Sequence, residues 1–242
     1  MPHTNLSLRT GRPWVVGSFG HAASLRDAEQ SVVMQHCDLA EIRLDLLRAE
    51  GAALDRACWQ HLAGVPLLFT ARCKAEGGAL ELDASQRSAL LLATLDTAAF
   101  IDVELASHGA MRELLAEAAH RSIPWIASYH DFEKLPPSAV LEEAAQRALA
   151  AGAAAFKVAA MLHSPADLAR LAEFQLAAHG LPLATMGMGG LGPVSRLLCA
   201  QSGSVLNYGY LGEAPTAPGQ WECGVLRDAI SRLPRRGRPA KP

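Results

Sequence analysis

The stretch Ala153-Ala154-Ala155-Phe156-Lys157-Val158-Ala159-Ala160-Met161 places one lysine in an otherwise apolar run that follows Gly152. A short apolar run bounded by a turn residue is typical of a buried strand, although a piece of buried helix gives the same pattern. A buried lysine loses hydration and seldom stays unpaired. Burial also favours the neutral amine, the form that attacks carbonyl carbon atoms. A lysine that reaches water from the strand end is the simpler alternative, so its neighbours decide between the two.

Short apolar runs alternate with longer amphipathic segments along all 242 residues. Strands that alternate with helices indicate βαβ units and a parallel sheet, and eight units in this length favour a single (β/α)8 TIM barrel over an open sheet. We predict strands near Trp14–Phe19, Asp38–Asp45, Leu67–Arg72, Ala99–Leu105, Pro124–His130, Ala153–Ala159, Leu181–Met186 and Ser204–Tyr208. We predict helices near Ser24–Gln35, Leu54–Leu62, Ser85–Thr97, Ala110–Arg121, Ser138–Ala151, Pro165–Ala178, Val194–Gln201 and Gln220–Leu233.

Several short motifs mark where these helices begin and end. Asp83-x-x-Gln86 fits a capping box, and Ser164-Pro165 combines a capping residue with a proline at the first helical position. Gly152 and Gly180 stand where helix C-terminal glycines belong. No low-complexity linker interrupts the pattern, so we expect one domain over residues 1–242.

The composition excludes several classes of partner. The formal net charge of −2 gives no field for nucleic acid or anionic membranes, and no apolar run has the length of a membrane span. The five cysteines are scattered and odd in number, and the first residues lack a signal's apolar core, which favours free thiols in the cytoplasm. The nine histidines show no metal-binding spacing, so we expect no metal. The basic segment 235–242 is expected to be a flexible solvated end; a nucleic-acid patch is the alternative, but it lacks an aromatic partner.

Ionisable residues recur at the predicted strand ends, where TIM barrels place their active sites. Arg43, Arg72, Glu104, His130 and Lys157 are separated by 26 to 32 residues, about one βα unit each. Five consecutive strands therefore bring an ionisable group to the same rim. Within the second strand, a period of two places Glu41, Arg43 and Asp45 on one face.

This set of side chains favours chemistry on a ketone. With Arg43 or Arg72 nearby, Lys157 would more readily be neutral and form an imine, which acidifies the adjacent carbon. His130 could take that proton and later pass one to a leaving hydroxyl, although a structural histidine is the alternative. A carboxylate from Glu76, Glu104 or Glu41 could hold the imidazole in one tautomer.

Two later segments complete the predicted site. Gly187-x-Gly189-x-x-Gly192 matches a dinucleotide fingerprint by letter, but it comes late in the chain, so we favour an anion-binding turn at a helix N-terminus with Arg196 as a carboxylate partner. The segment 211–220 contains two prolines and two glycines, which suits a lid that supplies Thr216 and Gln220 to the substrate. A surface ion pair for Arg196 and an ordinary connecting loop are the alternatives.

Taken together in order and spacing, these pieces resemble type I 3-dehydroquinate dehydratase over almost the whole chain. The matching motifs are Glu41-x-Arg43-x-Asp45, Phe69-Thr-Ala-Arg72-x-x-x-Glu76-Gly-Gly, Ile101-Asp-x-Glu104, Ser128-x-His130-Asp-Phe, Phe156-Lys157-Val-Ala, Met186-Gly-Met-Gly-x-x-Gly-x-x-Ser195-Arg196 and Ala217-Pro-Gly-Gln220. The resemblance implies a barrel, usually a homodimer, that dehydrates 3-dehydroquinate to 3-dehydroshikimate with neither metal nor external cofactor.

The resemblance also implies roles for individual residues. Lys157 matches the Schiff-base lysine, His130 the general acid and base, and Glu76 the glutamate that supports the histidine. Glu41, Arg43 and Arg72 match groups around the substrate hydroxyls, and Arg196 and Gln220 match carboxylate-binding groups.

This chain departs from the family pattern at a few positions. Thr216 stands where the family usually has Ser, Cys73 replaces a hydroxyl residue, and Asn207-Tyr208-Gly209 replaces the commoner Thr-Phe-Gly. None of these changes removes a group that the chemistry needs. A class I aldolase on the same barrel, and a non-catalytic paralogue that binds a related metabolite, are the alternative functions.

Overall fold

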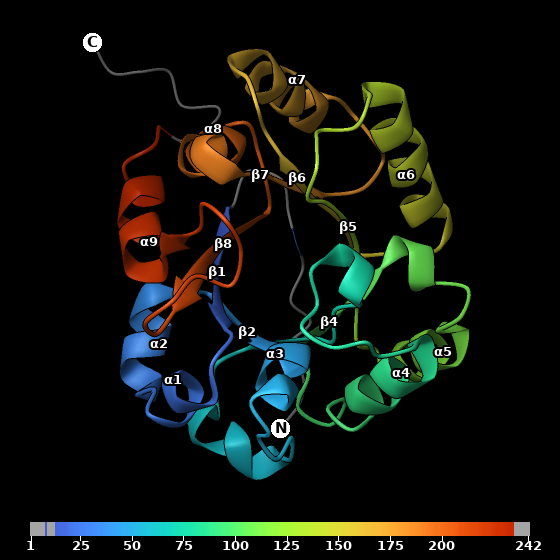
Figure 1. Ribbon diagram of the computed structural model, residues 1–242, viewed down its shortest axis with the longest axis vertical. Helices are drawn as coiled ribbons and strands as arrows, with labels where there is room; N and C mark the ends of the chain where they lie inside the picture. Colours follow the sequence, from blue (N-terminus) through green and yellow to red (C-terminus); the bar gives the residue numbers. More distant parts are fainter. Residues whose placement is uncertain (1–7, 9–12, 235–242) are drawn as a thin grey trace.

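The computed structural model describes Leu8 and residues 13–234, and the eight predicted strands are present in the predicted order. Figure 1 shows the helices arranged as a ring around the strands. The strands are β1 (Trp14–Phe19), β2 (Leu39–Arg43), β3 (Leu67–Thr70), β4 (Phe100–Glu104), β5 (Trp125–Asp131), β6 (Ala155–Met161), β7 (Leu183–Met188), β8 (Leu206–Leu211) and β9 (Trp221–Glu222). The helices are α1 (Ala22–Arg26), α2 (Gln30–His36), α3 (Leu44–Ala49), α4 (Ala84–Leu92), α5 (Arg112–His120), α6 (Ser138–Ala150), α7 (Pro165–Leu176), α8 (Gly192–Gln201) and α9 (Cys223–Ser231).

The strands form a parallel sheet that closes on itself. Each of β1 to β6 pairs with the next strand in sequence, and β1 also pairs with β8. The remaining gap is bridged where the Val205 amide, just before β8, donates to the Leu183 carbonyl at the start of β7 over 2.9 Å. This closure confirms the (β/α)8 barrel. The two residues of β9 extend the sheet beside β8 and were not predicted.

Alternation along the strands separates two hydrophobic cores. One face of each strand packs against the helices, as Ile42 and Phe69 do. The opposite face fills the barrel floor with a second cluster that includes Leu68, Phe100 and Ile126. Because the period of a strand is two, the next inward positions toward the carboxyl ends are filled by polar residues such as Asp102 and Ser128. The floor is therefore apolar and the layer above it is polar.

Most predicted helix signals are confirmed, and two predicted helices are wrong. Asp83 with Gln86 and Ser164 with Asp167 both form capping boxes. The predicted helix Ser24–Gln35 is two helices, because Glu29 has an extended backbone and begins α2. The predicted helix Leu54–Leu62 consists of two 3-10 turns, the first capped by Asp55 through the Ala57 amide.

The helix that follows β2 is α3, which takes in the end of the predicted strand Asp38–Asp45. Asp45 therefore lies in the first turn of a helix and not on a strand. An acidic side chain is favourable at that position because the helix N-terminus carries partial positive charge. The predicted basic tail, 235–242, lies outside the described residues. No helix in the described part of the chain is long and apolar enough to cross a membrane.

Candidate active site

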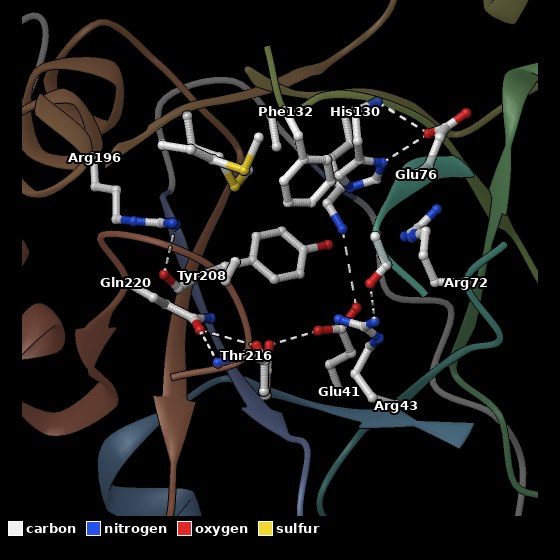
Figure 2. Close-up of a pocket in the computed structure, with 17 residues that line it drawn as sticks. Glu41, Arg43, Arg72, Glu76, His130, Phe132, Arg196, Tyr208, Thr216 and Gln220 are labelled. Carbon is white, nitrogen blue, oxygen red and sulfur yellow. Dashed lines mark hydrogen bonds and ion pairs between the residues drawn. The ribbon is translucent and has the colours of Figure 1, made fainter. Parts of the chain in front are cut away.

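A pocket with about 500 Å³ of empty volume opens at the carboxyl ends of the barrel strands. All nine predicted site residues line it: Glu41, Arg43, Arg72, Glu76, His130, Lys157, Arg196, Thr216 and Gln220. In Figure 2, Arg196 and Gln220 lie on one side of the pocket, with His130, Glu76 and Arg72 on the other and Tyr208 between them. The strands and loops therefore gather side chains from most of the chain at one place.

Lys157 is buried within the polar layer of the barrel, with 5 % of its surface exposed. Its Nζ donates a hydrogen bond to Asp102 Oδ2 over 3.0 Å and lies 3.9 Å from Glu41 Oε1. The same atom lies 4.2 Å from the centre of the Tyr208 ring, a favourable contact for a cation. The lysine does not reach out to water. Its nearest charged partner is the carboxylate of Asp102.

Asp102 joins the lysine to Arg72. Its Oδ1 accepts hydrogen bonds from Arg72 Nη2 at 2.9 Å and from the Ser128 hydroxyl at 2.5 Å. Burial raises the pKa of Asp102, but the positive charges of Arg72 and Lys157 outweigh it and bring the pKa to about 2. Asp102 is therefore ionised at neutral pH and balances two buried cations.

His130 and Glu76 form a hydrogen-bonded pair on the rim. Nδ1 of His130 lies 2.8 Å from Glu76 Oε2, and the His130 backbone amide donates to the same oxygen over 3.0 Å. Burial, followed by the positive charges of Arg72, Lys157 and Arg43, holds the pKa of His130 well below its usual value. Burial also raises the pKa of Glu76 to about 7, although the charge of Arg72 opposes the shift.

Of the three carboxylates that the sequence offered as partners of the His130 imidazole, Glu76 is the one that contacts it. Glu104 instead accepts from the Cys73 amide and from the Arg87 guanidinium, beneath the rim. Glu41 accepts from the hydroxyls of Ser18 and Thr70. With Nδ1–H bound to Glu76, Nε2 of His130 carries the free lone pair and has no hydrogen-bond partner among the described residues.

Arg43 and Arg72, which line the pocket, form ion pairs with different acidic residues. Arg43 makes a two-point ion pair with Asp45, at 3.0 and 2.8 Å. Arg72 donates to Ser128 and Asp102, and its Nη1 lies 3.3 Å from Glu104 Oε1. Asp45 also accepts from the backbone amide of Arg72, so it fixes the start of the loop that carries Glu76. These contacts fix both guanidinium groups before any ligand enters.

Arg196 is a buried cation without a carboxylate partner among the described residues. Its Nη1 donates to the Tyr208 carbonyl at 2.9 Å, and its Nε donates to the Gly219 carbonyl at 3.3 Å. Burial lowers the pKa of Arg196 to about 10, which still leaves it charged at neutral pH. A charge in this position, facing the pocket, suits an anionic ligand.

The segment that contains Thr216 and Gln220 lies over the pocket. The backbone amide and the hydroxyl of Thr216 both donate to Gln220 Oε1, at 2.8 and 2.9 Å. Gly219 has a positive φ of 73°, and a Cβ atom there would lie 2.5 Å from the Gly189 carbonyl oxygen. The glycine-rich turn after β7 thus allows the lid segment to approach closely. The Gly187 amide is already bound to the Ser195 hydroxyl at 2.8 Å.

Sequence reasoning missed two residues that contact Lys157. Asp102 stands beside Glu104 at a strand end and Tyr208 stands at a departure from the family pattern, but neither is among the predicted site residues. The period of a strand could have predicted both positions. Asp102 is two positions from Glu104 on β4 and therefore lies on the same face. Tyr208 is likewise two positions from Leu206, whose side chain fills the barrel floor.

The fold and the pocket together define a class of protein: a TIM-barrel enzyme with a buried lysine, paired with a carboxylate and placed beside an oriented imidazole. The model of the type I 3-dehydroquinase family matches residues 19–233. The chain belongs to that family.

Individual relatives agree with this assignment. The 3-dehydroquinate dehydratase of Methanocella arvoryzae is 34 % identical over 221 residues, which cover 91 % of this chain and 97 % of the relative. That of Shouchella clausii is 35 % identical and covers 88 % of each chain. The crystal structure of the Geobacillus kaustophilus 3-dehydroquinate dehydratase superposes with a TM-score of 0.82 at 26 % identity, covering 98 % of this chain and all of that one.

Proposed function

We propose that the chain dehydrates 3-dehydroquinate to 3-dehydroshikimate, a step of the shikimate pathway, through an imine on Lys157. The observation that carries this proposal is the position of Lys157, buried on Asp102 and the Tyr208 ring in the same pocket as His130. We propose that the reaction needs no metal and no external cofactor. The residues in the pocket provide a nucleophile, a base and an anion-binding group of their own.

The reaction begins when the Lys157 ammonium gives a proton to His130 and the amine attacks the keto carbon. His130 returns that proton to the hydroxyl formed at this carbon, which leaves as water to give the protonated imine. Nε2 of His130 is the base placed to take protons, because Glu76 holds its Nδ1. The protonated imine draws electrons from the adjacent carbon, whose proton passes to His130. The resulting enamine expels the neighbouring hydroxyl, which leaves as water with the proton from His130. Hydrolysis of the imine then releases the product and frees Lys157.

We propose that the remaining pocket residues bind the substrate. Arg196, a buried cation with no described acidic partner, receives the substrate carboxylate, and Gln220 from the lid segment assists it. Glu41, Arg43, Arg72 and Thr216 line the rest of the pocket and face the substrate hydroxyls. Because Asp102 and Asp45 already hold the two arginines, the pocket needs little rearrangement before binding.

We also propose that residues 1–242 act as one catalytic domain and that two copies form a homodimer in the cytoplasm. All five cysteines are free thiols, which suits a reducing compartment. The outer faces of α7, α8 and α9 expose Leu176, Val194, Leu198 and Val225, apolar surface that a second copy could cover. Light scattering on the purified chain measures the oligomeric state directly.

A turnover assay tests the proposed reaction. Purified protein with 3-dehydroquinate is expected to generate the conjugated enone absorbance of 3-dehydroshikimate. Lys157→Met should abolish it, whereas Lys134→Met, at an exposed lysine, should not. Products of carbon–carbon cleavage would identify an aldolase. Thermal stabilisation by the substrate with no absorbance change would identify a non-catalytic binding protein.

A further inference from the structure

Tyr208 lines the pocket with a buried hydroxyl that has no role in the chemistry described above. The side chain is 3 % exposed, and its Oη is buried with no hydrogen-bond partner among the described residues. A buried hydroxyl without a partner is costly, and native structures rarely keep one without a reason. Phenylalanine would have the same ring without this cost.

The position of Tyr208 connects the two ends of the pocket. Its backbone carbonyl accepts a hydrogen bond from Arg196, and its ring lies under Lys157 Nζ at 4.2 Å. In Figure 2 the hydroxyl points away from Arg196, toward the side of the pocket that holds His130, Glu76 and Arg72. A substrate that spans from the guanidinium to the amine must pass along this side chain.

The charges around the hydroxyl indicate that it donates a hydrogen bond and stays protonated. Burial is the largest influence that raises the pKa of Tyr208, and the carboxylates of Glu41 and Asp102 raise it further, against the charge of Arg72. Both carboxylates already accept hydrogen bonds from Ser18, Thr70, Ser128 or Lys157. The phenol therefore keeps its proton and is not bonded to either acid.

We propose that Tyr208 is a further substrate-binding residue, whose hydroxyl donates a hydrogen bond to an oxygen of the substrate held between Arg196 and Lys157. The ring keeps the cationic nitrogen of Lys157 in place, both as the ammonium and as the protonated imine. The hydroxyl thus lacks a partner only while the pocket has no substrate. This inference rests on the proposed function, since it assumes a small hydroxylated keto acid as the ligand.

Tyr208→Phe tests the proposal because it removes the hydroxyl and keeps the ring. The variant without substrate should unfold at the same temperature as the parent chain or a higher one, since no described hydrogen bond is lost. Its KM for 3-dehydroquinate should rise about tenfold, with kcat changed less than about threefold, because a substrate oxygen loses its donor. Tyr129→Phe is the matched control. Tyr129 lies on the face of β5 that packs against the helices and not on the face that lines the pocket, so this change should leave KM unchanged.

An unchanged KM in Tyr208→Phe would overturn the inference. A melting temperature several degrees below that of the parent would overturn it as well, because the hydroxyl would then serve the fold. Failure of the proposed function has a different signature, since the parent chain itself would not turn over 3-dehydroquinate. Turnover by the parent with no effect of Tyr208→Phe rejects only the assignment of Tyr208.

Discussion

Lys157 Nζ donates a hydrogen bond to Asp102 Oδ2 over 3.0 Å, in a layer of the barrel where both side chains are almost fully buried. Asp102 also accepts from Arg72, so one carboxylate balances two cations from neighbouring parts of the sheet. Lys157 is therefore paired with a carboxylate in a buried part of the barrel. The same carboxylate keeps the amine in position for the incoming ketone.

Replacing Asp102 should therefore destabilise the fold as well as the reaction. Asp102→Asn leaves Lys157 and Arg72 without their shared acid, and breaking a buried ion pair costs about 3 to 5 kcal/mol. Urea denaturation at pH 7 measures this loss of unfolding free energy. Asp96→Asn, which breaks the solvent-exposed pair with Arg121, should cost no more than about 1 kcal/mol. Equal effects of the two changes would contradict the importance given to the buried pair.

Asp102 also makes a specific contribution to acid stability. Its pKa is about 2 in the folded chain, below the ordinary aspartate value of about 3.9 expected when unfolded. The unfolded chain therefore binds a proton first, and the stabilisation is fully present above about pH 4 and is lost as pH falls toward 2. Acid titration of the parent chain should show this loss, and titration of Asp102→Asn should lack this component. The same slope in both proteins would contradict the lowered pKa of Asp102.

The pair of His130 and Glu76 should set the pH dependence of activity. When Glu76 is protonated, it donates a hydrogen bond to Nδ1 of His130, and the ring proton then lies on Nε2. Nε2 has no free lone pair in that state and cannot act as the base. Because the pKa of Glu76 is about 7, kcat/KM should rise as pH increases through about 7. Glu76→Gln still accepts from Nδ1–H but cannot titrate. Its profile should lose the step near pH 7, and retention of that step would assign it to another group.

Contact between the lid segment and the glycine-rich turn should be sensitive to a single methyl group. Gly219→Ala places a Cβ atom 2.5 Å from the Gly189 carbonyl and should displace the loop that carries Thr216 and Gln220. We expect kcat/KM to fall by about a hundredfold, since positioning by a closed lid is lost. Gly51→Ala is the matched control, because Gly51 has a similar φ of 76° with no atom within 4 Å of the added group. If kcat/KM fell equally in both variants, the loss would come from backbone strain at a positive φ and not from the contact with Gly189.

Much of the architecture could be predicted from the sequence because hydrophobic periodicity and capping signals are local. The strand around Lys157 and the capping box at Asp83 need only neighbouring residues to be recognised. The short helix α3 escaped prediction because its first residues, Leu44 and Asp45, continue the alternation of β2. Local pattern alone cannot distinguish a strand end from a first helical turn there.

That these side chains gather in one pocket could be predicted, but their pairing could not. The spacing of His130 and Lys157 by one βα unit places both on the same rim, as the structure has them. Which acid faces which base depends on loop conformation after the strands. Glu76 reaches His130 because a 3-10 turn, Lys74–Glu76, follows Arg72, while Glu104 turns toward Arg87.

The central claim is that Lys157 forms the imine, and chemical trapping tests it most directly. Protein incubated with 3-dehydroquinate and borohydride should carry a reduced covalent adduct, which peptide mass spectrometry should place on Lys157. Lys134→Met should show the same adduct, and Lys157→Met should show none. Absence of an adduct while the parent chain turns over substrate, or an adduct on another lysine, would contradict the account.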